Sequence, residues 1–217
     1  NLKTGPDGSV YVIDWYDKNA CHRTNSEIWD RTNGRIYNVR YVGAEGRGAR
    51  GEATDLAKLS DKELLELVYH PNEWQSRMAR RLLQERAANG TLTILSDGKN
   101  AQDSLFLRAL QPFGGNDVSK SLRALWTVHV LSQSIVEPKV QGGAKADRPS
   151  LKEGLKSLEV YLLNMCLQVR KDENVAAWAV QLLFENREWL NDNNRHVQQL
   201  FQRLPSLAEQ TQSPLLR

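Results

Sequence analysis

The chain has 217 residues, of which 40% are hydrophobic and 25% are charged, an ordinary composition for a folded globular protein. Its 29 basic and 26 acidic residues give a formal net charge of +3, which is too balanced to favour nucleic acid as a partner. No apolar run approaches the roughly 20 residues that a membrane-spanning helix needs. The composition therefore predicts one sizeable core or two small domains, with no membrane span in this segment.

The strand signals of the chain lie in its first forty or so residues. Residues 5–8, Gly-Pro-Asp-Gly, are typical of a turn, and the β-branched and aromatic run at 10–13 predicts that the turn leads into a buried strand. Asn-Gly at 33–34 is a strong hairpin signal between residues 28–30 and 35–41. Alternation in the second of these runs places Tyr37, Val39 and Tyr41 on one face. No other convincing strand pattern follows, so the β segment lacks partner strands, and we expect the chain to be part of something larger.

The loop at residues 14–23 is dense in carboxylates and aromatic side chains and holds one imidazole. Such a loop could line a ligand site, or hold a cation between Asp14 and Asp17. In the other interpretation it is a structural loop, in which Asp and Asn side chains cap turns. Two carboxylates fall short of a calcium-loop pattern, so the sequence predicts no metal site and identifies no catalytic residue.

Residues 5–41 carry a resemblance to a known family. Gly-Pro-Asp-Gly, Val-Tyr-Val-Ile-Asp-Trp-Tyr-Asp, Cys-His-Arg and Ile-Trp-Asp-Arg-Thr-Asn-Gly-Arg-Ile-Tyr follow one another in this segment. The string resembles the closing blade of the β-propeller in the membrane-bound dehydrogenases of the Planctomycetes and Verrucomicrobia. Those proteins resemble soluble quinoprotein sugar dehydrogenases in their propeller, carry helical HEAT-type repeats after it, and often end in a c-type cytochrome domain.

The resemblance implies a function, partners and a location. The full protein would oxidise a sugar or alcohol in the cell envelope or periplasm, with pyrroloquinoline quinone and c-type haem as cofactors held outside this segment. Its partners would be the missing propeller blades and a cytochrome domain of the same polypeptide. Asp14, Asp17, His22 and Arg23 would then be the ligand-binding candidates, because they sit in a loop at a strand end, where propeller ligands bind. This chain alone is expected to be inactive, since the earlier blades and the Cys-x-x-Cys-His haem segment are missing from it.

Helix signals dominate after a glycine-rich stretch. Residues 1–44 are assigned to the partial propeller blade and residues 45–59 to a linker, since four glycines fall within residues 43–52. Ser60 and Glu63 form a capping box that starts a short helix, which ends at His70-Pro71. Asn72 then caps a second helix that stops at Asn89-Gly90. The arginines of this second helix are predicted to form a solvated face, with an acidic partner surface as the alternative; they are Arg77, Arg80, Arg81 and Arg86.

The helical part also contains an internal echo. Residues 78–85 are matched by residues 178–185, and residues 121–126 offer a third copy whose register stays open. A second capping box at residues 150–153 begins another amphipathic helix. Repeated helical hairpins that cannot bury their faces alone must stack. The sequence therefore predicts a mainly α fold, in which residues 60–217 form a HEAT-like α-solenoid, truncated at its end, after a β-hairpin segment from the last propeller blade.

Two hypotheses about function remain open at this point. In the first, the chain is a fragment of a quinoprotein-like dehydrogenase, with the helical repeats as scaffold. In the second, it is a non-catalytic protein-interaction scaffold, whose helical repeats bind another protein. His70, His129 and His196 are too scattered for a metal site and are interpreted as a turn residue, a core-edge residue and a solvent-facing residue.

Overall fold

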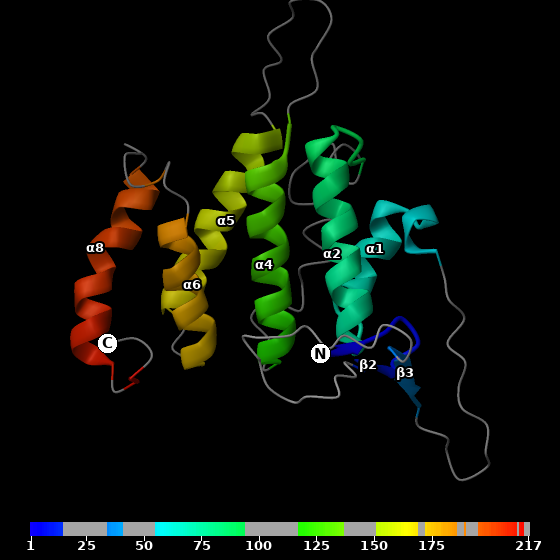
Figure 1. Ribbon diagram of the computed structural model, residues 1–217. Helices are drawn as coiled ribbons and strands as arrows, with labels where there is room; N and C mark the ends of the chain where they lie inside the picture. The colour runs from blue at the N-terminus through cyan, green and yellow to red at the C-terminus, as the bar shows by residue number, and fades with distance from the viewer. Residues whose placement is uncertain are drawn as a thin grey trace, which may run out of the picture.

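The computed structural model describes residues 1–14, 34–40, 55–93, 117–136, 151–168, 172–185, 189, 195–211 and 213–214. Within these residues the chain is mainly helical, with six α-helices and one small antiparallel sheet. Figure 1 shows α2, α4 and α6 side by side, with the sheet beside α1 and α2 at one end of the array and α8 at the other. The mainly α fold with a β segment at its start is as predicted.

The sheet has three strands in the order β1-β2-β3, namely Leu2–Thr4, Val10–Ile13 and Ile36–Val39. Both strand pairs are antiparallel, and Val12 is opposite Leu2 on one side and Tyr37 on the other. The predicted turn at 5–8 joins β1 to β2, and Gly8 takes a φ of +78° that favours glycine. Strand β1 was not predicted, because three residues are too few to show alternation.

One face of this sheet is apolar and uncovered. The register places Leu2, Val10, Tyr37 and Val39 together, and they are 67%, 38%, 47% and 59% exposed. Tyr37 and Val39 share this face as predicted, while Tyr41 and the run at 28–30 lie outside the described residues. The prediction of a buried strand is wrong for β2, whose four residues are exposed or half-buried, since none of the described residues fully covers this face.

The turn between β1 and β2 is hydrogen-bonded to the helical array. Asn72 Nδ2 donates to the carbonyl oxygens of Gly5 and Pro6 at 3.1 and 3.2 Å, and Gln75 Nε2 donates to that of Pro6 at 3.2 Å. Asn72 is also the N-cap of α2, since its Oδ1 accepts from the Trp74 amide at 2.9 Å. One side chain thus starts the helix and holds the sheet against it.

The first two helices follow their sequence signals closely. Helix α1 spans Asp61–Leu67, and both bonds of the Ser60–Glu63 capping box are present. Helix α2 spans Glu73–Ala88, with Gly90 at a φ of +67° just beyond its end. Before them, within the residues assigned to the linker, a 3₁₀ helix η1 (Leu56–Lys58) packs on α2 and buries Leu56 in the core.

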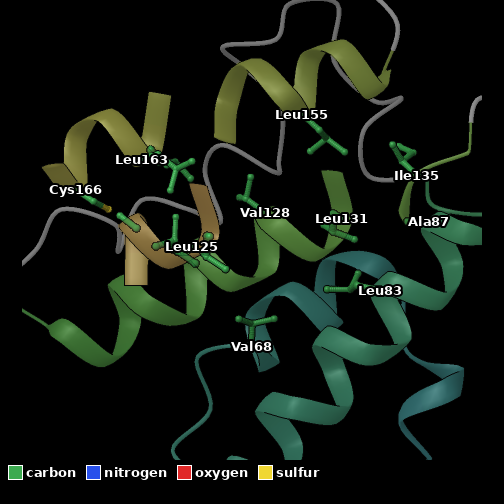
Figure 2. Packing of buried hydrophobic residues seen from close by; sticks show 14 of the residues in the cluster. Val68, Leu83, Ala87, Leu125, Val128, Leu131, Ile135, Leu155, Leu163 and Cys166 are labelled. Carbon is green, nitrogen blue, oxygen red and sulfur yellow. The ribbon is translucent and has the colours of Figure 1, made fainter. Parts of the chain in front are cut away.

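The remaining helices are α4 (Val118–Ser134), α5 (Leu151–Gln168), α6 (Glu173–Glu185) and α8 (Arg195–Gln210). Helix α4 packs on α2, α5 and α6, and α5 packs on α6 and α8. Of the predicted capping box at 150–153, Ser150 lies outside the described residues, but the helix that it introduces is present. Apolar side chains of α1, α2, α4 and α5 converge on one interior (Figure 2).

Helices α2, α4 and α6 repeat one burial pattern, counted from their caps Asn72, Asp117 and Asp172. The seventh residue after each cap is a fully buried alanine, and the eleventh is a fully buried leucine or valine. These positions are Ala79, Ala124 and Ala179, and then Leu83, Val128 and Leu183. The structure thereby fixes the register of the third copy, which the sequence left open.

The two roles of Asn72 can be separated by substitution. Asn72→Ala should lower the free energy of unfolding by about 1–2 kcal/mol, since a helix cap and two hydrogen bonds are lost. Asn72→Asp should keep the cap but lose both donors to the turn. We therefore expect Asn72→Asp to speed hydrogen exchange at Gly5 and Gly8 while the α2 amides stay protected, as read by mass spectrometry. Unchanged exchange in the turn would contradict this role, and Arg81→Ala on the exposed face of α2 is the control.

Candidate functional site

Of the four ligand-binding candidates, the structure describes Asp14, at the end of β2. The Asp14 amide donates to the Arg35 carbonyl at 2.8 Å, and the Tyr37 hydroxyl lies 3.4 Å from Asp14 Oδ2. Asp17, His22 and Arg23 lie outside the described residues. Asp14 is therefore held beside one hydroxyl, and whether the four side chains come together stays a prediction.

A buried polar network joins α4, α5 and α6. Glu159 of α5 is 0% exposed, and its Oε1 lies 2.6 Å from Nδ1 of His129 on α4. Its other oxygen, Oε2, accepts a hydrogen bond from the buried Ser132 hydroxyl. The second ring nitrogen of His129 lies 3.6 Å from Oε2 of Glu185 at the end of α6. His129 thus stands between carboxylates of two helices.

The geometry of this network is structural rather than catalytic. An activated serine needs its hydroxyl on the imidazole base, but Ser132 Oγ donates to Glu159 and to the His129 carbonyl oxygen instead. Both Ser132 and Glu159 are buried, so no substrate reaches them. The network satisfies a buried carboxylate and fixes α4, α5 and α6 relative to one another.

The sequence contained a signal for this network. Glu159 follows Leu155 by four residues and precedes Leu162 and Cys166 by three and seven, so a carboxylate stands on the apolar face of α5. A charged group in such a position requires a partner from another element. The interpretation of His129 as a core-edge residue gave its position but missed its partner.

Two arginines of α2 are not on a solvated face. Arg86 donates to Asp61 Oδ1 at 2.6 Å and to the carbonyl oxygens of Ala57 and Leu59 at 2.9 and 2.7 Å. Arg80 is half-buried, with its guanidinium carbon 5.4 Å from the centroid of the Trp126 ring. The predicted solvated face therefore holds for the exposed Arg77 and Arg81, whereas Arg80 and Arg86 bind other parts of the same chain.

Helix α4 is held on α2 by a second ion pair and by aromatic contacts. The buried Arg123 donates to Glu73 and, at 2.8 Å, to the His70 carbonyl oxygen. The Trp126 ring, which lies under Arg80, meets Trp178 of α6 edge to face at 4.9 Å. These two tryptophans thus pack between helices.

A cleft of about 720 Å³ separates part of α5 from part of α8. Buried Trp189 and Val197 line its base, and exposed Tyr161 and Gln199 line its walls. His196, interpreted as solvent-facing, is exposed and also lines the cleft. Among the pockets lined by described residues, this one has the size of a small-molecule site.

The described residues contain no cluster of His, Cys, Asp or Glu side chains that could hold a metal ion, and no helix long and apolar enough to cross a membrane. Cys166 is a free, buried thiol, and burial raises its pKa to about 12, so it is unreactive at neutral pH.

Comparisons with models of protein families, with curated proteins and with solved structures found no match. Function must therefore be argued from the residues of this chain.

Removing the buried carboxylate should be costly. Glu159→Ala removes the buried carboxylate that pairs with His129 and Ser132, and we expect the free energy of unfolding in urea to fall by about 3–5 kcal/mol. Glu159→Gln keeps the shape and one acceptor oxygen and should cost less. Glu153→Gln, on the exposed side of the same helix, is the control and should change stability by less than about 0.5 kcal/mol. Equal losses from Glu159→Ala and from the control would exclude this role for the network.

The Asp61–Arg86 pair should make stability depend on pH. Burial alone would raise the pKa of Asp61, but hydrogen bonds from Arg86 and Thr93 outweigh it and hold the pKa below its ordinary value. The carboxylate therefore stabilises the fold at neutral pH, and this contribution is lost as the pH falls below about 4. Urea unfolding between pH 7 and 2.5 should show a steeper acid loss for the native chain than for Asp61→Asn; equal slopes would contradict the assignment.

Proposed function

We propose that this chain is the connecting scaffold of a quinoprotein-like dehydrogenase, in which it completes a β-propeller and links it to a helical array. The observation that carries the proposal is the exposed apolar face of the sheet, with Leu2, Val10, Tyr37 and Val39 uncovered. A small sheet gains stability when its apolar face is covered by another element. Residues 5–41 resemble a closing propeller blade, and in a propeller the neighbouring blades would cover this face.

The joint between sheet and helices supports a scaffold rather than a loose tether. Asn72 and Gln75 donate three hydrogen bonds to the turn at Gly5 and Pro6, so the sheet is held against the N-terminus of α2. A β domain built on this sheet would be positioned by α2 and would not rely on a flexible linker for its orientation. This is what a connecting scaffold requires.

The helical part acts in this proposal as a HEAT-like solenoid. The shared register of α2, α4 and α6, with a fully buried alanine seven residues after each cap, favours successive copies of one unit. Such units bury their faces only by stacking. The array would carry a cytochrome domain of the same polypeptide, or a separate protein partner, in the cell envelope or periplasm.

Catalysis belongs to the rest of the proposed protein. It would oxidise a sugar or alcohol with pyrroloquinoline quinone and pass electrons to a c-type haem, both held outside this segment. Asp14 and Tyr37 offer one carboxylate and one hydroxyl, which alone do not make a binding site for either cofactor. One wall of the substrate or cofactor site would be formed by the four candidates, Asp14, Asp17, His22 and Arg23.

The second candidate is a non-catalytic interaction scaffold. It is favoured by the polar networks of the helical part, because the buried side chains Glu159, Ser132 and Arg123 are all engaged between helices. In this case the uncovered sheet would still bind another β domain, but no quinone chemistry would follow.

Dye reduction by the longer polypeptide distinguishes the two candidate functions. The longer polypeptide that includes the propeller should, after reconstitution with quinone, reduce a dye in the presence of sugars or alcohols, and His22→Ala should lower this rate by about tenfold or more. Asn38→Ala, on the opposite face of β3 from Tyr37, is the control. Activity that is unchanged in His22→Ala removes His22 from the site. A longer protein without dye reduction, in which β3 amides nevertheless exchange more slowly than in this chain, would favour the scaffold alone.

A further inference from the structure

The cleft between α5 and α8 combines an apolar base with polar walls. Trp189 and Val197 are buried at the base, at 1% exposure each. Tyr161 is 58% exposed on the α5 wall, one turn beyond the exposed Ser157, and the exposed Gln199 lies across from them on α8. The volume of about 720 Å³ lies within the range of roughly 300–1,000 Å³ usual for small-molecule sites.

The side chains in this cleft match one class of ligand best. A sugar ring has an apolar face of C–H groups, which packs on an aromatic ring, and hydroxyls that both donate and accept hydrogen bonds. Ser157, Tyr161 and Gln199 can each both donate and accept, and they come from both walls. A phosphate-bearing ligand would need a surplus of positive charge, but Glu153 lines the cleft beside Lys156. An apolar helix would need a groove without these polar groups.

We propose that the cleft between α5 and α8 binds a neutral carbohydrate of one or two sugar units. The sugar ring packs on Tyr161, and its hydroxyls bond to Ser157 on one wall and Gln199 on the other. Arg203 of α8 donates to Asn164 of α5, so the two walls are held together at the cleft. The proposal uses none of the candidate residues at positions 14–23 and stands whether or not the chain belongs to a dehydrogenase.

The test is titration of the 217-residue chain with glucose, galactose, N-acetylglucosamine, maltose and cellobiose, followed by calorimetry and saturation-transfer NMR. At least one of these should bind saturably. Tyr161→Ala should weaken that binding by about tenfold, the size expected for loss of an aromatic contact, and Gln199→Ala should weaken it to a lesser extent. Arg81→Ala is the control, because Arg81 is exposed on α2 and does not line the cleft.

Three outcomes would overturn the proposal. The first is no saturable binding of any of the five sugars. The second is binding that Tyr161→Ala and Arg81→Ala weaken equally while both variants keep native circular dichroism, which would place the sugar elsewhere. The third is binding of inorganic phosphate, weakened by Lys156→Ala and unaffected by sugar, which would make the cleft an anion site.

Discussion

Several interfaces between packed helices in the described part of the chain carry a polar contact as well as apolar packing, and these polar contacts help to fix how the helices are placed. Arg86 of α2 binds Asp61 of α1, Arg123 of α4 binds Glu73 of α2, and His129 of α4 binds Glu159 of α5. Apolar contacts alone tolerate sliding by a residue or a turn, because leucine, valine and alanine present similar surfaces along a helix. A buried charge has one acceptable partner position, since leaving it unpaired costs several kcal/mol, about 3–5 in typical cases. The chain therefore uses leucine-rich packing for stability and a few ionic contacts for register.

The parts of the fold that the sequence predicted are those encoded by neighbouring residues. The Ser60–Glu63 capping box, the Asn72 cap and Gly90 all act within four residues of the helix end that they mark, so their helices were placed closely. The turn before β2 was predicted for the same reason. The similarity of residues 121–126 to the other two segments was visible in the sequence, but the register of the match was not. Asp117 is the N-cap of this helix, and no capping-box glutamate follows it to mark the start of the helix.

The features that could not be predicted from the sequence are contacts between residues far apart in the chain. Arg80 and Arg86 were assigned to a solvated face because their partners, Trp126 and Asp61, lie 46 and 25 residues away in the chain. Glu159 is the exception, because a carboxylate on an apolar stripe must be paired inside the fold, and its place on that stripe is visible in the sequence. The candidate site in the loop was placed by resemblance, and of its four residues the structure describes Asp14. The cleft was invisible in the sequence, because its walls come from helices that pack only in three dimensions.

Figure 1 shows α8 at the opposite end of the helical array from the sheet. The sheet is held on α2, and the cleft is lined by residues of α5 and α8. Between them stand three helix contacts, α2 with α4, α4 with α5, and α5 with α8, each spanning about 8–10 Å between axes. All three carry a polar contact, through Glu73, Glu159 and Asn164 in turn. Helices whose contacts are fixed in this way hold the sheet and the cleft in a constant arrangement, which is the property that the proposed scaffold between a β domain and a second ligand needs.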